Sequence, residues 1–160
     1  MSKSIRYKVI RAELEHKEVV LSLLDEFQVV CAKIIEPERP FVSKPAAVLE
    51  PSFEKTIKAP NFAVFLAMTG DRFVGIVTVC NIPQMRRGVY CAEIEEMYVI
   101  PEFQGKGVAM DLVAAAEEWA KENGGKTLRL ESSNELKRAH RFYEKAGFKY
   151  YGRAYEKNLA

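Results

Sequence analysis

The run from Glu93 to Ala109 constrains the fold of this chain more than any other segment. Residues 93–100 have the composition of a β-strand that carries carboxylates, and Pro101 ends it. Gly105 and Gly107 then form a turn that opens an amphipathic helix, predicted over 106–123. A short strand over 127–130 follows. A strand–helix–strand unit of this kind predicts a right-handed crossover and a parallel pair of strands.

The residues before this unit predict an antiparallel meander. Three apolar stretches have strand character, and short turns separate them: Gly70-Asp71 is typical of a two-residue hairpin, and 83–88 is a second turn. The expected strands are 62–69, 72–81 and 89–100. The sheet is therefore predicted to be mixed and mostly antiparallel.

The two ends of the chain complete the predicted fold. Four prolines within 36–51 forbid a long helix there and indicate a loop or short helical pieces. Ser132 and Glu135 have the spacing of a capping box, which predicts where the last helix begins. The remaining expected elements are a strand over 5–10, helices over 15–31, 50–58 and 132–146, and a last strand over 148–153.

Composition limits the classes of function. The chain has 160 residues, 48% of them hydrophobic, which predicts one folded domain over 1–160. A net charge of +2 argues against a dedicated nucleic-acid binder. No apolar run is long enough for a membrane span, and three widely spaced cysteines without a CxxC pair predict reduced thiols in the cytoplasm. The sequence has no cluster of His and Cys, so no metal site is predicted.

The glycine turn predicts an anion-binding site. Gly105 and Gly107 let the backbone approach a phosphate, Lys106 adds a cation, and the positive end of the helix dipole lies behind them. Two other nucleotide signatures do not fit. Val108 stands where a P-loop needs Lys followed by Ser or Thr, and Met110 replaces the third glycine of a dinucleotide fingerprint.

Three carboxylates in the acidic strand predict recognition of a cationic or proton-releasing substrate. Alternation puts Glu93 and Glu95 on one face and Glu96 on the other, although a bulge would change this parity. A lysine-like amine has a pKa near 10.4, and an ordinary glutamate near 4.3 is about six units too weak to take its proton directly. Such a glutamate would have to anchor a water relay, or have its pKa raised by burial. Solvated surface carboxylates are the simpler interpretation.

Two residues near the carboxyl end have open roles on the residues alone. Tyr143 falls on the inward side of its helix and is either a core tyrosine or a functional phenol. Asn134 is more often a helix-start residue than a ligand. His140 falls on the polar side of the same helix, and Cys91 is expected to be a buried thiol rather than a nucleophile.

Two of these motifs, in order and in register, resemble those of the GNAT acyl-CoA-dependent N-acetyltransferases. The stretch 104–109, Gln-Gly-Lys-Gly-Val-Ala, is similar to that family's Q/R-x-x-G-x-G/A element, with Ala109 as an accepted variant. The stretch 142–148, Phe-Tyr-Glu-Lys-Ala-Gly-Phe, is similar to its C-terminal motif. The resemblance implies a single-domain GNAT-like α/β fold, with a mixed, mostly antiparallel sheet, helices on both faces and splayed central strands.

The same resemblance implies a donor and roles for individual residues. Acetyl-CoA would be the cosubstrate and a primary amine the acceptor. Tyr143 would protonate the departing thiolate, and Glu95, with Glu96 second, would be base or water anchor. Asn134 would contact the pantetheine or nearby water. The backbone of Met97 and Val99 would hold the pantetheine arm, and the pyrophosphate would be held by backbone N–H groups of Gln104, Gly105, Lys106, Gly107, Val108 and Ala109.

The acceptor and the partners are less constrained. Clustered carboxylates favour a cationic small molecule, and a protein or peptide amine is an alternative. A binding module that senses acyl-CoA without turnover is a hypothesis of another class. A homodimer rests on the resemblance alone, and no nucleic-acid or membrane partner is expected.

Overall fold

The computed structural model describes residues 7–159, which form a five-stranded sheet in the order β1-β2-β3-β4-β5. The pairs β1–β2, β2–β3 and β3–β4 are antiparallel, and β5 runs parallel to β4. The expected meander and the parallel pair are thus confirmed. The strands are β1 (Lys8–Arg11), β2 (Phe62–Thr69), β3 (Arg72–Gln84), β4 (Val89–Val99) and β5 (Gly125–Leu130). Ile5, placed in the first strand by its pattern, lies outside the described residues.

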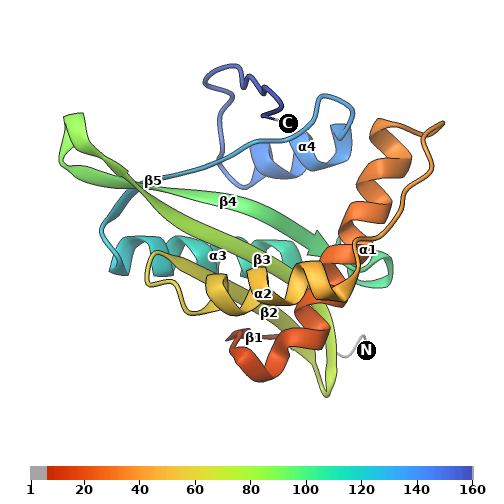
Figure 1. Ribbon diagram of the computed structural model, residues 1–160. Coiled ribbons are helices and arrows are strands. Elements are labelled where there is room, and N and C mark those ends of the chain that lie inside the picture. Colours follow the sequence, from red (N-terminus) through yellow and green to blue (C-terminus); the bar gives the residue numbers. More distant parts are fainter. Residues whose placement is uncertain (1–6, 160) are drawn as a thin grey trace, which may run out of the picture.

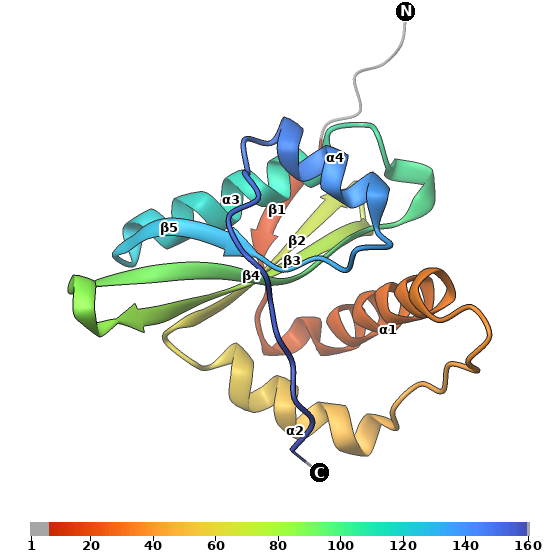
Figure 2. The same ribbon diagram turned by 90° about the horizontal axis from the view of Figure 1, so that it is seen from above.

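Helices cover both faces of the sheet, as expected (Figures 1 and 2). Helices α1 (Lys17–Ile35) and α2 (Ala46–Ile57) lie on one face, and α3 (Val108–Glu122) and α4 (Lys137–Lys145) lie on the other (Figure 2). The apolar stripe predicted for α3 is buried, with Leu112 and Ala116 fully buried and Trp119 only 5% exposed. Burial of this stripe fixes the helix, and therefore the glycine turn at its start, against β2 and β3.

A β-bulge interrupts the pairing of β3 with β4 at Glu95. Thr78 is opposite Glu96 and Val79 is opposite Ile94, so Glu95 is the extra residue. Beyond the bulge the alternation of β4 is reversed. Glu96 therefore lies on the same face as Glu93, not on the opposite face as simple alternation predicts.

Strand β4 extends beyond the carboxyl end of β5. Their pairing stops at Ile94 and Leu130, while β4 continues to Val99. The N–H of Ile100 donates to the carbonyl of Val74 at 3.0 Å, and Val99 is opposite Gly75. Because hydrogen-bonded and non-bonded pairs alternate in an antiparallel ladder, the backbone groups of Met97 and Val99 point away from β3. They face the gap that β5 has left, which confirms the expected splay.

Two expectations about helix starts were wrong. Helix α2 begins at Ala46 rather than at residue 50, and it contains Pro51. Proline removes one helical hydrogen bond, but the carbonyl that loses its partner belongs to exposed Ala47 and can bond to water. Helix α4 begins at Lys137 with no side-chain cap, so the capping box of Ser132 and Glu135 does not form. Residues 133–136 instead make a turn in which the N–H of Leu136 donates to the carbonyl of Ser133.

The strand expected over 148–153 was also wrong. Residues 148–159 have no regular secondary structure, and Tyr150 and Tyr151 are 84% and 75% exposed. A cavity of about 1450 Å³ lies between this segment, α4 and β5. A strand needs a partner at hydrogen-bonding distance, and the separation from β5 removes that partner.

We predict that Gly125→Ala destabilises the protein by about 1–3 kcal/mol, the usual cost of overpacking. A Cβ at residue 125 would meet the carbonyl oxygen of Ala120 at 2.8 Å, and this backbone atom of α3 cannot move aside cheaply. Urea denaturation measures the change. Gly152→Ala is the matched control, since a Cβ there meets nothing within 4 Å. Equal stability of the two variants would contradict the prediction.

Candidate functional site

The glycine turn between β4 and α3 presents a row of open backbone amides. Gly105 and Gly107 have φ values of +76° and +94°, which favour glycine, and a Cβ at either position would meet nothing within 4 Å. Among the described residues, no acceptor is found for the N–H groups of residues 105–109. Helix α3 begins at Val108 with no side-chain cap. Uncapped amides at the positive end of a helix form an anion-binding site.

Gln104 was expected to contribute its backbone N–H to the pyrophosphate site, and in the structure this N–H has an acceptor. Its own N–H donates to the carbonyl of Pro101 at 3.3 Å, so the open amides begin at Gly105. Its side-chain Nε2 donates to the carbonyl of Val99 at 2.8 Å. Gln104 therefore ties the turn to the end of β4, and it leaves the N–H of Val99 and both backbone groups of Met97 facing the gap.

Lys106 lies over an aromatic ring. Its ammonium is 5.2 Å from the centre of the Phe103 ring, and the guanidinium of Arg72 lies 5.3 Å from the same centre. Arg72 is also paired with Glu102 at 3.1 Å. Glu102 offsets the charge of Arg72, so Lys106 is the cation that adds positive potential beside the open amides.

The carboxylates of β4 gather on the face that α1 covers. The hydroxyl of Thr78 donates a hydrogen bond to the carboxylate of Glu96. The backbone N–H of Glu96 donates to the hydroxyl oxygen of Thr78 at 3.0 Å. Glu93 pairs with Arg129 on β5. Glu95 lies between them, 3.8 Å from the sulfur of Cys80, and its carboxylate makes no ion pair among the described residues. Of the three, Glu95 is the carboxylate free to meet a cation.

The setting raises the proton affinity of two of these groups. Partial burial, followed by the charges of Glu93 and Glu96, raises the pKa of Glu95 above its ordinary value. Burial also raises the pKa of Glu96, and the bond from Thr78 offsets part of that effect. A raised pKa brings a carboxylate closer to the range in which it can accept a proton from water or an amine. Burial, followed by the charges of Glu95 and Glu93, raises the pKa of the Cys80 thiol to about 11, which keeps it protonated.

Cys91 is not placed for covalent chemistry. It is 5% exposed, its thiol contacts Thr127 at 3.2 Å, and it pairs with β5 at the end of the strand remote from the glycine turn. This agrees with the expectation of a buried thiol.

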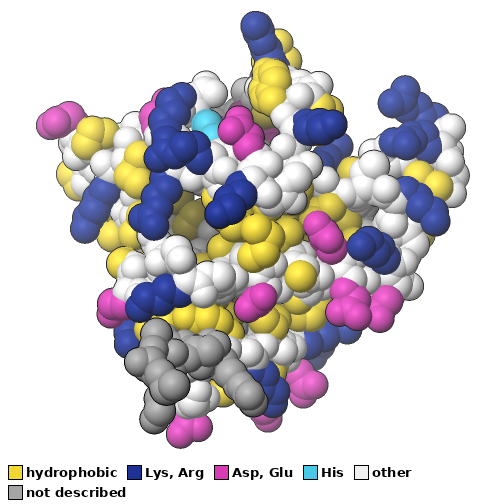
Figure 3. Space-filling view, turned by 180° about the vertical axis from the view of Figure 1, so that it is seen from behind, with side chains coloured by type: hydrophobic (Ala, Val, Ile, Leu, Met, Phe, Trp, Pro, Cys, Tyr) yellow, Lys and Arg dark blue, Asp and Glu magenta, His cyan; other side chains and the backbone are white. Residues whose placement is uncertain are grey.

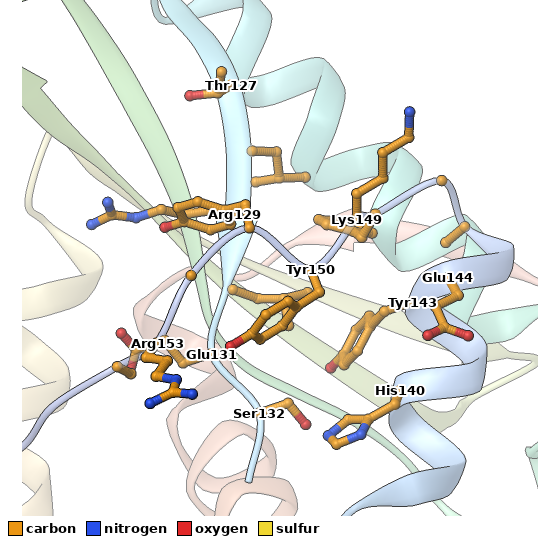
Figure 4. Close-up of a pocket in the computed structure, with 18 of the residues that line it drawn as sticks. Thr127, Arg129, Glu131, Ser132, His140, Tyr143, Glu144, Lys149, Tyr150 and Arg153 are labelled. Atoms are coloured by element: carbon orange, nitrogen blue, oxygen red, sulfur yellow. The ribbon is translucent and has the colours of Figure 1, made fainter. Parts of the chain in front are cut away.

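Tyr143 and Asn134 line one cavity, the space of about 1450 Å³ between β5, α4 and the C-terminal segment. Figure 4 shows Tyr143 on its wall. Residues 97–109 are not among its walls. Glu93, Glu95 and Glu96 do not line it either. The structure therefore places Tyr143 and Asn134 on the walls of one cavity, and the glycine turn and the acidic face outside it. Burial raises the pKa of the Tyr143 phenol to about 12, so it remains a proton donor at neutral pH.

Sequence reasoning missed His140. It was expected on the polar side of α4, but it lines the same cavity as Tyr143. Its Nε2 lies 2.8 Å from the carbonyl oxygen of Ser133. The spacing of three residues between His140 and Tyr143 on one helix could have signalled a shared face.

Basic side chains gather around the same end of the molecule. In the view from behind, Lys and Arg lie over the region of α4 and the C-terminal segment (Figure 3). This region carries Lys137, Arg138, Arg141, Lys145, Lys149 and Arg153. Such a surface attracts an anionic ligand over several ångströms.

A comparison with protein families decides the classification. Residues 29–148 match the family described as "Acetyltransferase (GNAT) family". The chain belongs to this family. The match covers both the glycine turn and α4, so the resemblance noted in the sequence is confirmed.

Two curated relatives of this GNAT chain are similar over about 60% of its length. The aminoalkylphosphonate N-acetyltransferase of Salmonella typhimurium is 29% identical over 97 residues, which cover 61% of this chain and 63% of the relative. The N-alpha-acetyltransferase 30 of Schizosaccharomyces pombe is 32% identical over 96 residues, covering 60% and 63%. The matched part thus spans less than two thirds of each relative.

Solved structures share the fold. A transcriptional regulator from Bacillus halodurans C-125 has a TM-score of 0.80 at 24% identity, covering 96% of this chain and 100% of the other. The aminoglycoside acetyltransferase AAC(6')-Iy, in complex with the bisubstrate analogue CoA-S-monomethyl-acetylneamine, has a TM-score of 0.79 at 17% identity, covering 97% and 99%. These likenesses confirm the GNAT-like fold.

Within residues 7–159, no helix has the length and apolarity to cross a membrane. The same residues contain no group of three or more His, Cys, Asp or Glu side chains arranged to hold a metal ion.

We predict that the free energy of unfolding falls less between pH 4 and pH 7 in Glu96→Gln than in the wild-type protein. The pKa of Glu96 is raised in the folded state, so the wild-type protein loses stability as the pH rises from the ordinary value of about 4.3 through the raised one. A tenfold difference in proton affinity between the folded and unfolded states corresponds to about 1.4 kcal/mol. Urea denaturation at both pH values is the measurement. Glu118→Gln, on the exposed face of α3, should leave the pH dependence unchanged.

Proposed function

We propose that this chain is an N-acetyltransferase that moves an acetyl group from acetyl-CoA to a primary amine, by direct transfer in a ternary complex. A cationic small molecule is the proposed acceptor. The observation that carries the proposal is the conjunction of two sets of unpaired backbone groups: the amides of residues 105–109, and the edge of β4 at Met97 and the N–H of Val99. Membership of the GNAT family supports it.

The chain fits a coenzyme with a diphosphate and an amide-bearing arm. The diphosphate would accept hydrogen bonds from Gly105, Lys106, Gly107, Val108 and Ala109. The pantetheine amides would pair with Met97 and the N–H of Val99, as a peptide pairs with a sheet edge. Asn134 would meet the arm from the other side of the gap. Gln104 would contribute by holding the turn against Val99, because its own N–H already donates to Pro101.

Two side chains would transfer protons: Glu95 as the acceptor and Tyr143 as the donor. The coenzyme thioester supplies the activated acetyl group. Glu95, with Glu96 as its neighbour, would receive the proton of the attacking amine, directly or through water, because its raised pKa improves it as a base. Tyr143 would donate a proton to the departing sulfur, which its phenol can do because it is protonated at neutral pH.

The acceptor would enter from the face where α1 covers β4. The carboxylates of Glu93, Glu95 and Glu96 lie there, and Tyr98 joins this face to α1 through its hydroxyl, 3.4 Å from Glu26. Net negative charge favours a cationic amine. The Salmonella relative, named for an aminoalkylphosphonate, supports a small-molecule acceptor.

A protein or peptide amine is the second candidate acceptor. The Schizosaccharomyces pombe relative is named an N-alpha-acetyltransferase, which favours this alternative. Steady-state release of free CoA, measured with a panel of polyamines, aminoglycosides and peptides, separates the two. Binding of CoA without release of product from any amine would favour a sensor instead.

We further propose a cytoplasmic location, which suits the three free thiols. A homodimer stays a prediction.

We predict that Gly107→Ala weakens CoA binding at least about tenfold, a loss of about 1.4 kcal/mol. Its φ of +94° is strained for alanine, so the turn must shift and its amides change direction. Isothermal calorimetry with CoA is the measurement. Gly70→Ala is the control, because its φ of +55° is also left-handed and a Cβ there also meets nothing within 4 Å. If wild-type protein binds no CoA at millimolar concentration, the proposed function is wrong.

We predict that Glu95→Gln removes the acid limb of the pH profile. Wild-type kcat/KM should rise with pH through the raised pKa of Glu95, because the base form is the active one. The kcat/KM of the variant should rise with pH only as the amine loses its proton, by up to about tenfold per pH unit. Glu131→Gln is the comparison: removing this charge should move the limb to lower pH without abolishing it. An unaltered profile for Glu95→Gln would transfer the role to Glu96 or to solvent.

We predict that Tyr143→Phe lowers kcat by about 10²-fold or more, the usual contribution of a general acid, with little change in the KM for acetyl-CoA. Steady-state kinetics measures both constants. Tyr90→Phe, on β4 far from the turn, is the control. An unchanged kcat would exclude Tyr143 as the acid.

A further inference from the structure

The connection between β5 and α4 is held by a histidine of the helix that follows it. The ring nitrogen Nε2 of His140 lies 2.8 Å from the carbonyl oxygen of Ser133. A carbonyl can only accept, so Nε2 carries the proton and donates it. The bond reaches back across seven residues and joins the first turns of α4 to the connection 131–136.

Little else fixes this connection. Among the described residues, no other side chain donates a hydrogen bond to residues 131–136. The capping box that would have ordered it is absent. Its backbone bonds are those donated by Leu136 to Ser133 at 3.0 Å, by Lys137 to Glu135 at 2.9 Å, and by His140 to Leu136 at 3.1 Å, where α4 begins. The hydroxyl oxygen of Ser132 is buried without a partner. The histidine bond therefore carries much of the order in this segment.

The same bond relates the two predicted site residues of this region. Asn134 belongs to the connection, and Tyr143 lies one helical turn beyond His140. All three line one cavity. Figure 4 shows the side chains of Ser132, His140 and Tyr143 directed toward the same part of it.

We propose that His140 is a positioning residue that holds the β5–α4 connection, and with it Asn134, at a fixed place relative to Tyr143. The proposal rests on the proposed function in its view that this segment contacts the pantetheine arm. Neutral imidazole with its proton on Nε2 and the imidazolium both donate this bond, so the role does not require titration of the ring. The bond acts mainly on coenzyme binding, because it orders the segment before the chemical step.

Three substitutions separate this role from others. The amide nitrogen of glutamine reaches the position of Nε2, whereas that of asparagine reaches only the position of Nδ1. We expect His140→Leu and His140→Asn to raise the KM for acetyl-CoA and the Kd for CoA up to about tenfold, as loss of one hydrogen bond allows, with kcat within about twofold. His140→Gln should restore wild-type values and leave the pH profile unchanged.

His16 provides a matched control. Its Nδ1 accepts a hydrogen bond from the N–H of Glu13 at 3.0 Å, at the start of α1 and away from the cavity. His16→Leu also removes a hydrogen bond between a histidine side chain and the backbone, but it should leave the KM for acetyl-CoA unchanged. Thermal unfolding of each variant shows whether the fold is retained.

Two kinetic results would overturn the proposal. One is a His140→Leu variant that is folded and has wild-type KM and Kd. The other is a His140→Gln variant that loses kcat and one limb of the pH profile, which would make the ring an acid or base. A readout without coenzyme keeps this test distinct from the proposed function: ¹⁵N NMR should show the proton of His140 on Nε2, and hydrogen exchange of residues 133–136 should be faster in His140→Leu. A ring protonated on Nδ1 alone, or unchanged exchange, would equally overturn it, even if wild-type protein bound no CoA.

Discussion

The separation of β4 from β5 is the constraint on which the candidate site depends. Inside a sheet, every backbone N–H and C=O of a central strand has a partner. Beyond Ile94 the partner strand is gone, and β4 continues with the groups of Met97 and Val99 turned into the gap. Polar backbone groups without partners are costly unless water or a ligand satisfies them. A ligand with its own amides is the natural complement of such an edge.

The glycine turn follows from the same separation. Because β4 ends at the gap, the chain that leaves it must turn sharply before α3 can pack back on β2 and β3. Gly105 and Gly107 supply the left-handed conformations, and Gln104 fixes the turn to the carbonyl of Val99. The open amides and the open strand edge are therefore neighbours along the chain, held by a helix whose apolar stripe packs into the core.

The bulge at Glu95 organises the charge on the other side of the strand. Without it, Glu96 would point to the α3 face and into an apolar core, where an unpaired carboxylate is costly. With it, Glu93, Glu95 and Glu96 share the face beneath α1, and each has a distinct neighbour: Arg129, Cys80 and Thr78. An anion-binding turn and an acidic face thus lie on one strand and the turn that follows it.

The local pattern of the sequence determined most of the framework. The meander, the parallel β5, the α3 stripe and the glycine turn were predicted, because each depends on residues close in the chain. The tertiary structure decided the rest. It shifted the parity of β4, because a bulge depends on the partner strand. It started α4 at Lys137, and it left residues 148–159 out of the sheet. Each of these outcomes depends on contacts between distant segments, which no local spacing encodes.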